Sequence, residues 1–151
     1  MKDLIIKAAR DAGSLLMDNF ERGIRVEFKG KYDLVTEADR QSEALIVGLI
    51  RERFPEHDIL AEEEDYGQFN SEYRWIIDPL DGTTNFAHGF PWFAVSIALE
   101  VRGRLTLGVV YNPYVGELYL AERGQGYFIN ERRQPVSETR NFERALLATG
   151  I

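Results

Sequence analysis

The chain contains no cysteine and only two histidines among its 151 residues. The absence of cysteine excludes disulfides, thiolate metal sites and a cysteine nucleophile, and it agrees with an intracellular protein. No apolar run approaches the ~18 residues that span a bilayer, so no membrane partner is expected. The chain begins Met1-Lys2-Asp3 and passes straight into an amphipathic pattern instead of a signal sequence, which predicts a cytoplasmic location.

Positive charge is also scarce, since 18 Lys and Arg residues face 25 Asp and Glu residues and the net charge is −7. This excess argues against a nucleic-acid partner, because such a surface requires a basic patch. An acidic protein attracts a phosphate-bearing substrate only if bound cations reverse the local field. The carboxylates therefore make chemical sense as ligands of a metal site. Length and a hydrophobic content of 44% predict one soluble globular domain.

The most informative segment runs from Trp75 to Phe86 and has the sequence WIIDPLDGTTNF. Its apolar start delivers two carboxylates, Asp78 and Asp81. Between them Pro79 fixes φ and lacks an N–H donor, so a turn can aim both side chains and the Leu80 carbonyl at one point. Oxygen-only ligands select a hard cation, and Mg²⁺ fits best because carboxylates, waters and phosphate oxygens are its usual ligands.

The residues after Asp81 suit a phosphate. Gly82 lets the backbone come close, and Thr83 and Thr84 can open a helix whose free N–H groups face an anion. The alternative is a plain strand and turn, because Asp-Gly is a common hairpin dipeptide and Asp or Thr often caps backbone N–H groups. A hairpin does not need the upstream Asp-Pro, and a cap does not need a second carboxylate, so the whole string favours a metal-and-phosphate site.

Two other acidic positions have competing explanations. The run Glu62–Glu64 is typical of a solvated surface, but residues 59–61 (ILA) resemble a short buried strand that would lead Glu62 toward the site. Thr36 and Asp39 have the spacing of a capping box at a helix start, and the sequence alone supports a cap and a catalytic role for Asp39 equally.

The histidines and aromatic residues are expected to be structural. His57 is predicted at the surface and His88 in local packing, because neither has a partner at metal spacing and a hard oxygen site does not use imidazole. The aromatic residues around the motif are expected in the core, where they would make the site rigid. These are Trp75, Phe86, Phe90, Trp92 and Phe93.

Hydrophobic periodicity predicts two helices. Apolar residues recur at helical spacing from Ile5 to Phe20, and Gly23 follows as a stop signal. After a polar stretch at residues 29–32, a second helix is predicted from Glu37 to about Phe54, closed by Pro55. Its predicted buried face consists of Leu45, Ile46, Leu49 and Ile50.

The period then changes to that of strands. The predicted strands are Tyr73–Ile77, Phe93–Val101, Leu105–Tyr111, Glu117–Ala121 and a last short one at Gln125–Asn130. Short links between them favour an antiparallel meander, so the fold class is α+β, with two N-terminal helices packed on a largely antiparallel sheet. We expect a further covering layer over an exposed sheet face with apolar positions such as Val95, Ile97, Val109 and Leu118.

The segment Trp75–Phe86, followed by residues 87–91 (AHGFP), closely resembles the signature of the inositol monophosphatase family. Residues 33–39 (DLVTEAD) resemble its early motif, Glu62-Glu63 its acidic pair, and residues 108–111 (GVVY) a core strand. The resemblance covers essentially the whole chain and implies the first αβ layers of an αβαβα sugar-phosphatase fold. Residues 1–151 would then be the N-terminal metal-binding αβ domain. The family's C-terminal half, which carries one more metal-binding aspartate and most of the substrate pocket, is absent from this chain.

The resemblance also implies roles for individual residues. A first metal would be held by Glu62, Asp78 and the Leu80 carbonyl, and Asp78 and Asp81 would share a second metal. Asp39 would pair with Thr83 to activate water. The phosphate would lie against Asp81, Gly82, Thr83 and Thr84. Apart from the resemblance, we expect Glu63 to support the site, Glu64 to be exposed, and Asp33 to hold the loop before the second helix.

The implied activity is magnesium-dependent, lithium-sensitive hydrolysis of inositol monophosphate, or of a similar small sugar or polyol phosphate, by metal-activated water. Related enzymes act on fructose bisphosphate, histidinol phosphate or phosphoadenosine phosphate. Because the exposed apolar sheet face requires a covering layer from a C-terminal half or a partner subunit, we also expect the longer natural chain to be a homodimer. The alternative from another class is a non-catalytic binding or assembly module, since some relatives are linked to transcription complexes.

Overall fold

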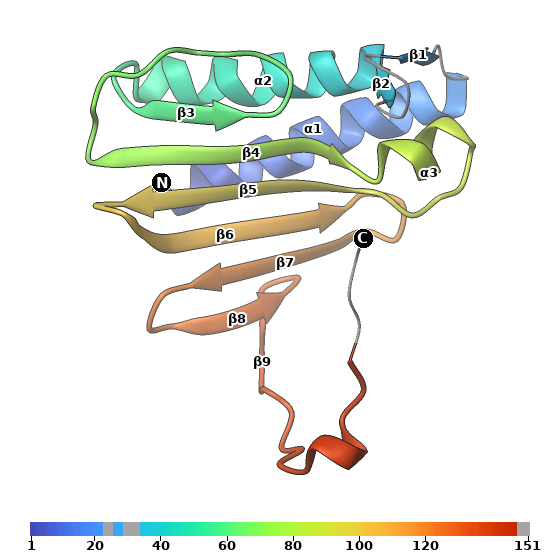
Figure 1. The fold of residues 1–151 in the computed structure, drawn as a ribbon, viewed down its shortest axis with the longest axis vertical. Coiled ribbons are helices and arrows are strands. Elements are labelled where there is room, and N and C mark those ends of the chain that lie inside the picture. Colours follow the sequence, from blue (N-terminus) through green and yellow to red (C-terminus); the bar gives the residue numbers. More distant parts are fainter. Residues whose placement is uncertain (23–25, 29–33, 148–151) are drawn as a thin grey trace.

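The computed structural model describes residues 1–22, 26–28 and 34–147. Two long helices precede a run of strands, which confirms the α+β prediction (Figure 1). The elements are α1 (Lys2–Arg22), β1 (Val26–Phe28), β2 (Leu34–Thr36), α2 (Glu37–Arg53), β3 (Asp58–Ala61), β4 (Tyr73–Asp81), α3 (Thr83–Ala87), β5 (Ala94–Val101), β6 (Arg104–Asn112), β7 (Glu117–Glu122), β8 (Gly126–Ile129), β9 (Arg132–Gln134) and the 3₁₀ helix η1 (Phe142–Arg144). In these ranges no helix combines the length and the apolar character needed to cross a membrane.

Seven strands form the main sheet in the order β3-β4-β5-β6-β7-β8-β9, and β1 and β2 form a separate antiparallel pair. Only β3 and β4 run parallel in the main sheet, so the prediction of a largely antiparallel sheet is confirmed. The β5–β6 hairpin turns on Arg102 (φ 52°) and Gly103 (φ 71°). Two successive positive φ values are those of a type I′ turn, whose twist matches that of paired strands.

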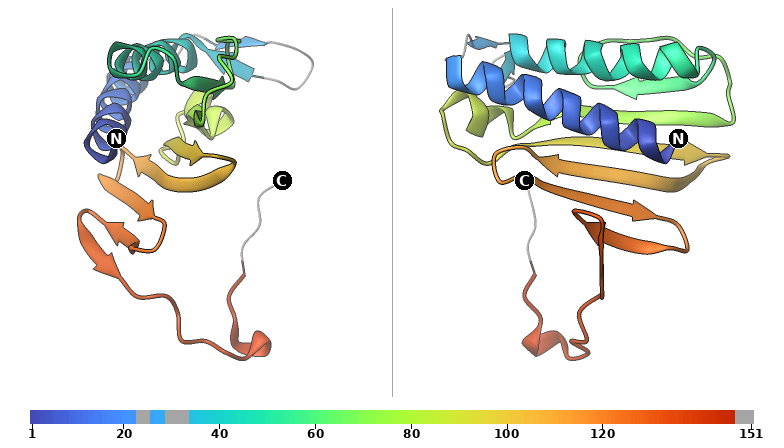
Figure 2. Two further views of the ribbon diagram at one scale, coloured as in Figure 1. Left: turned by 90° about the vertical axis from the view of Figure 1, so that its left-hand side faces the viewer. Right: turned by 180° about the vertical axis from the view of Figure 1, so that it is seen from behind.

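Both long helices cover one face of the sheet, as the side view in Figure 2 shows. Alternate residues of a strand point to opposite faces, and those pointing to the helices are apolar and buried, such as Trp75, Ile77 and Val95. Helix α1 approaches β6 closely at Gly13, where an added Cβ would lie 2.5 Å from the ring of Tyr111. The core therefore lies between the helices and the sheet.

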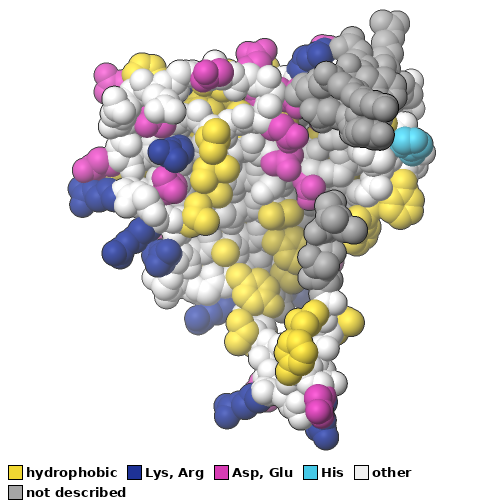
Figure 3. Space-filling view, in the orientation of Figure 1, with side chains coloured by type: hydrophobic (Ala, Val, Ile, Leu, Met, Phe, Trp, Pro, Cys, Tyr) yellow, Lys and Arg dark blue, Asp and Glu magenta, His cyan; other side chains and the backbone are white. Residues whose placement is uncertain are grey.

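The opposite, open face of the sheet has no helix over it in the described part of the chain (Figures 1 and 2). Our assignment of Val95, Ile97, Val109 and Leu118 to an exposed face was wrong, because all four are at most 3% exposed and belong to the buried cluster under the helices. Strand pairing keeps directly opposite residues on one face, so these four share one face. The open face instead carries an apolar groove, and the side chains on this face that line it are Ser96, Ala98, Val110, Tyr119, Ala121 and Tyr127. Figure 3 shows apolar side chains along the middle of this face.

The buried face of α2 also differs from the prediction. Ile46 and Ile50 are buried as expected, but Leu45 and Leu49 are only half-buried. The buried face is rotated toward Asp39, Ser42 and Glu43, which are at most 3% exposed. Apolar periodicity cannot detect this rotation, because buried polar residues look like solvent-facing ones in the sequence.

The prediction that His57 lies at the surface was wrong. Its ring is stacked between those of Phe54 and Tyr73, with centroids 4.5 and 4.6 Å away. Its Nδ1 accepts a hydrogen bond of 3.1 Å from Trp75 Nε1, which is donor-only. Burial and the charge of Arg51 lower the pKa of His57.

The aromatic residues around the signature divide into two groups. Trp75, Phe86 and Phe93 are at most 3% exposed, as predicted, whereas Phe90 is 57% and Trp92 60% exposed. Both exposed residues lie in the connection between α3 and β5, so the prediction that all five are core was wrong for these two.

Candidate metal and phosphate site

Asp78 and Asp81 lie on β4 itself and not in a turn after it, because the strand continues four residues beyond its predicted end. The register of β4 and β5 shifts between these two residues, because Asp78 pairs with Ser96 and Asp81 pairs with Ala94. Residues three apart in a regular strand point to opposite faces. The extra residue is a β-bulge that brings both carboxylates to the open face, and Pro79 suits a bulge because it has no N–H to pair.

The bulge exposes backbone groups that other residues satisfy. Ser42 of α2 donates a hydrogen bond of 2.9 Å to the Pro79 carbonyl. The Leu80 N–H donates a hydrogen bond of 3.2 Å to Asp78 Oδ1. The Leu80 carbonyl lies 3.0 Å from Thr83 Oγ1, and the Leu80 side chain is buried. The carbonyl that the sequence assigned to the metal is thus in contact with Thr83.

Gly82 connects the bulged strand to α3. It has φ 89° and ψ 34°, a left-handed conformation that favours glycine. An added Cβ would lie 3.0 Å from the carbonyl oxygen of Trp92, so a side chain would also be crowded there. The predicted helix start at Thr83 is confirmed, and the helix is short, ending at Ala87.

Thr83 and Asp39 come together although 44 residues separate them. Thr83 Oγ1 donates to Asp39 Oδ1 at 3.1 Å, and Asp39 is 3% exposed in the first turn of α2. The two side chains are therefore in contact, as the family resemblance implied. The competing capping box uses Thr36, whose side chain lies outside the described part of the structure, as does Asp33.

Glu62 follows β3 directly and is exposed, as is Glu64, while Glu63 is half-buried. The strand leading to Glu62 is less buried than predicted, because Leu60 on the open face is 55% exposed. Because β3 pairs in parallel with β4, with Ala61 opposite Ile77, Glu62 leaves the sheet beside Asp78. The acidic run is therefore not only a solvated surface.

The pKa of Asp78 reflects its closeness to the other carboxylates. Burial, together with the charges of Glu62 and Asp81, raises the pKa of Asp78 to about 7; the Leu80 N–H lowers this pKa, and Asp39 adds a smaller increase. Carboxylates this close together repel one another, so binding of a proton or a cation is favoured. Figure 3 shows acidic side chains gathered on this part of the open face.

These oxygen donors fit Mg²⁺ in type and charge, since carboxylates and a carbonyl are ligands of hard cations. Within residues 1–22, 26–28 and 34–147, however, no three His, Asp or Glu side chains form a ready metal-binding group. The carboxylates are close enough to affect the pKa of Asp78 but do not surround one point. The site is therefore a set of candidate ligands in an open arrangement.

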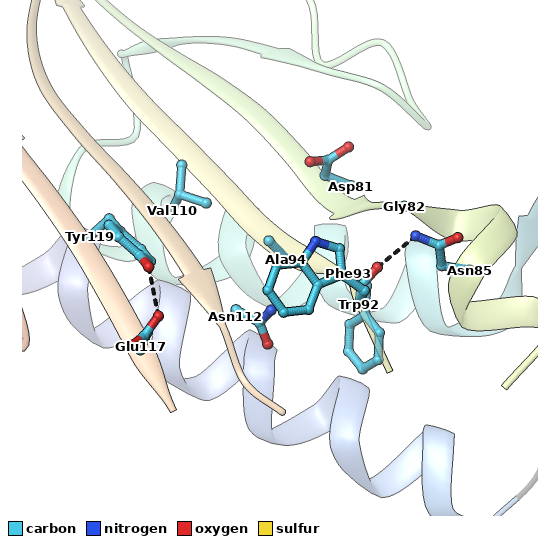
Figure 4. Close-up of a pocket in the computed structure, with 10 residues that line it drawn as sticks. All are labelled: Asp81, Gly82, Asn85, Trp92, Phe93, Ala94, Val110, Asn112, Glu117 and Tyr119. Atoms are coloured by element: carbon cyan, nitrogen blue, oxygen red, sulfur yellow. Dashed lines mark hydrogen bonds between the residues drawn. The ribbon is translucent and has the colours of Figure 1, made fainter. Parts of the chain in front are cut away.

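A cavity of about 380 Å³ adjoins the site on the open face. Its walls include Asp81, Gly82, Trp92 and Asn112, and Figure 4 shows these side chains around it. Asn85 of α3 donates a hydrogen bond of 2.8 Å to the Trp92 carbonyl, which fixes the α3–β5 connection at its edge (Figure 4). The phosphate-binding candidates thus border a space large enough for a small polyol.

The remaining predicted residues have local roles. Thr84 is exposed, and its carbonyl lies 2.8 Å from the ring Nδ1 of His88, which is also exposed. His88 is thus exposed and not packed as predicted, although it makes a local contact at the end of α3. Ser42 and Glu43 were not predicted as site residues from the sequence. Their spacing from Asp39, three and four residues along a helix, is the signal that could have identified them, because such residues share one face.

The profile of the inositol monophosphatase family matches residues 1–151. The chain belongs to this family. It is 42% identical to "Inositol monophosphatase 3" of Solanum lycopersicum over 97% of this chain and 56% of that protein. It is 45% identical to "Nus factor SuhB" of Haemophilus influenzae over 100% of this chain and 58% of that protein. The chain therefore spans a little over half the length of these relatives.

Solved structures show the same fold. The extragenic suppressor protein suhB of Bartonella henselae matches with a TM-score of 0.86 and 44% identity, over 92% of this chain and 55% of that one. Two others match at TM-score 0.73 and 29% identity over 82% of this chain. One is an IMPase/NADP phosphatase with Mg²⁺ and phosphate (48% of that chain), and the other a staphylococcal inositol monophosphatase in a LiCl-soaked inhibitory complex (47%).

Proposed function

We propose that this chain is the N-terminal part of a magnesium-dependent phosphomonoesterase that hydrolyses inositol monophosphate or a similar small polyol phosphate. The single observation that carries the proposal is the bulge in β4, which brings Asp78 and Asp81 to the same face beside the Thr83–Asp39 pair. A strand needs no such bulge for its own stability. The solved relative with Mg²⁺ and phosphate supports the choice of metal and of substrate group.

The candidate ligands are the side chains of Glu62, Asp78 and Asp81 and the Leu80 carbonyl. When bound, Mg²⁺ would lower the pKa of a coordinated water and stabilise charge on phosphate oxygens. The chain's own contribution is to hold four oxygen donors near one another. The raised pKa of Asp78 supports this role, because a cation relieves the repulsion that now favours the protonated carboxyl.

Thr83 and Asp39 would orient the attacking water and take up its proton. The Thr83 hydroxyl has one hydrogen and two acceptors within reach, Asp39 Oδ1 at 3.1 Å and the Leu80 carbonyl at 3.0 Å. It can donate to only one of them at a time. If the Leu80 carbonyl serves as a ligand, Thr83 donates to Asp39, and its lone pairs are then directed to a water.

The phosphate would bind at the turn from β4 into α3. The first N–H groups of a helix have no acceptor within the helix, so those of Gly82, Thr83 and Thr84 can point to phosphate oxygens. The absence of a side chain at Gly82 lets the phosphate approach the backbone. The adjoining cavity of about 380 Å³ would receive part of the organic group.

The whole protein would be a cytoplasmic homodimer. A further part of its chain would cover the open face of the sheet. Support comes from the length of the relatives, of which this chain covers 56% and 58%. The exposed groove across β5, β6 and β7 is apolar, which is typical of a surface that is covered.

The experiment is phosphate release from a panel of monoesters by the natural protein at its full length, with and without Mg²⁺. We expect release from inositol monophosphate that stops when EDTA is added. Asp78→Asn is the inactive control and should keep less than a tenth of the wild-type rate at saturating Mg²⁺. A folded protein that releases no phosphate from any monoester would exclude the proposed activity.

A binding or assembly module is the second candidate. The observation that favours it is the close relationship to proteins named Nus factor SuhB. Binding of a macromolecule does not require a proton-accepting pair or a metal ligand, so this function should survive Asp78→Asn. Loss of both functions in that variant would argue that they share one site.

A further inference from the structure

We infer that Glu43 is a positioning residue that fixes Glu62 for metal binding. This inference rests on the proposed function, because it assigns a cause to the placement of one proposed ligand. Glu43 is 1% exposed on α2, although a carboxylate is seldom fully buried without partners. Neither the metal ligands nor the Thr83–Asp39 pair explains its burial.

The contacts of Glu43 all lie on the connection from β3 to β4. Its Oε2 accepts the Glu63 N–H at 2.7 Å, and its Oε1 accepts the Glu64 N–H at 2.9 Å and the Tyr66 hydroxyl at 3.0 Å. All three partners are donors. A carboxylate satisfies them with acceptors alone, which an amide cannot do.

These bonds fix the backbone on the far side of Glu62. On its near side, Ala61 is paired with Ile77 in the sheet. The Glu63 N–H belongs to the peptide that follows Glu62, so Glu62 is held between the sheet and Glu43. Because the backbone is held on both sides of Glu62, the position from which its side chain starts, next to Asp78 on the neighbouring strand, is fixed as well.

The geometry also explains the polar face of α2. Asp39, Ser42 and Glu43 are buried together, and each reaches a different part of the site: α3 through Thr83, the β4 bulge through the Pro79 carbonyl, and the β3–β4 connection through Glu63. One rigid helix thus aligns three segments that are distant in sequence. Residues that orient ligands commonly change metal affinity 10- to 100-fold when altered.

The test is Mg²⁺ titration of the natural full-length protein by calorimetry, in the wild type, Glu43→Gln, Glu62→Gln and the double variant. In Glu43→Gln an amide N–H₂ faces a backbone N–H, so we expect Mg²⁺ to bind at least tenfold more weakly. In the Glu62→Gln background, Glu43→Gln should change the affinity less than twofold, because its effect passes through Glu62.

Asp58→Asn is the matched control. Asp58 is another buried carboxylate, and it accepts the N–H groups of Phe69 and Ser71 at the far end of the same connection. We expect it to lower the melting temperature but to leave Mg²⁺ affinity within twofold of wild type. Should Glu43→Gln fail to fold, Tyr66→Phe replaces it, with an expected two- to fivefold loss of affinity that depends on Glu62.

The outcomes separate the two ideas. If Glu62→Gln binds Mg²⁺ like the wild type, the proposed metal site fails. If Glu62→Gln weakens binding but Glu43→Gln does not, or if the two effects multiply, the site stands and the role of Glu43 is overturned. That role is also overturned if Asp58→Asn weakens Mg²⁺ binding as much as Glu43→Gln does.

Discussion

The hydroxyl of Thr83 donates to the carboxylate of Asp39 at 3.1 Å, joining the first turn of α3 to the first turn of α2. Asp39 is buried, so this contact is shielded from bulk water. A buried carboxylate beside a hydroxyl is a common arrangement for accepting a proton during hydrolysis.

Replacing the Thr83 hydroxyl should lower catalysis and leave binding intact. Thr83→Val keeps the shape but removes the group between Asp39 and the Leu80 carbonyl. We expect kcat to fall about 100-fold with little change in KM, in line with the usual contribution of positioned proton transfer. Steady-state kinetics on inositol monophosphate measure this. Thr84→Val is the control, because Thr84 is proposed to act through its N–H, and it should stay within threefold of wild type.

The metal-free protein should lose stability as pH rises from about 4 to 7. The pKa of Asp78 is raised from 3.8 to about 7 by burial and by neighbouring carboxylates. In that window the folded state keeps a proton that the unfolded state has lost, so rising pH favours unfolding. The shift alone implies ~4 kcal/mol, and we expect about 2 kcal/mol because the site borders solvent.

Melting curves in EDTA from pH 4 to pH 8 test this for the wild type and Asp78→Asn. The variant should be the more stable protein at pH 8 although it is inactive, and the difference should vanish near pH 4. Burial also raises the pKa of Glu43, which adds a slope of the same sign to both proteins. If the stability of the two proteins changed with pH in parallel, the raised pKa of Asp78 and its proposed cause would be contradicted.

Magnesium should raise the melting temperature at pH 7.5. A ligand that binds only the folded state stabilises it in proportion to the logarithm of its concentration over Kd. Asp81→Asn should reduce this increase by at least half, since a proposed ligand is lost. Glu64→Gln removes one negative charge nearby on an exposed side chain and should change little. Equal melting curves with and without Mg²⁺ would count heavily against the site.

Lithium at millimolar concentration should inhibit the full-length enzyme. The family resemblance implies inhibition through one of two metal positions after ester cleavage, and a solved relative at 29% identity is a LiCl-soaked inhibitory complex. Initial rates at several Mg²⁺ concentrations measure the effect. Magnesium-dependent activity that is indifferent to lithium would show that metal coordination at the second position differs here.

Residues 1–151 expressed alone should be a poor catalyst. Positioning of substrate contributes several kcal/mol to catalysis, so the loss of a wall around the substrate should lower the rate by orders of magnitude. The apolar groove on the open face should also bind a hydrophobic dye. Phosphate release and dye fluorescence, compared with the full-length protein, check both points. A soluble, dye-free monomer with the full rate would show that this part suffices.

The residues themselves determined the chemistry and most of the elements. Carboxylates without cysteine or paired histidines indicated a hard-cation site, and periodicity placed both long helices and the strands of the meander to within a few residues. The signature string predicted which residues gather around the turn into α3. These properties are local, because side-chain chemistry and the alternation of apolar residues are present in the sequence itself.

Tertiary structure alone decided how the site is built. The bulge between Asp78 and Asp81 is a property of the pairing of β4 with β5, so neither strand reveals it by itself. The buried polar face of α2, with Ser42 and Glu43, was missed because a polar residue facing a partner looks the same in sequence as one facing water. Burial of a carboxylate depends on donors brought from another segment, and only the folded chain brings them together.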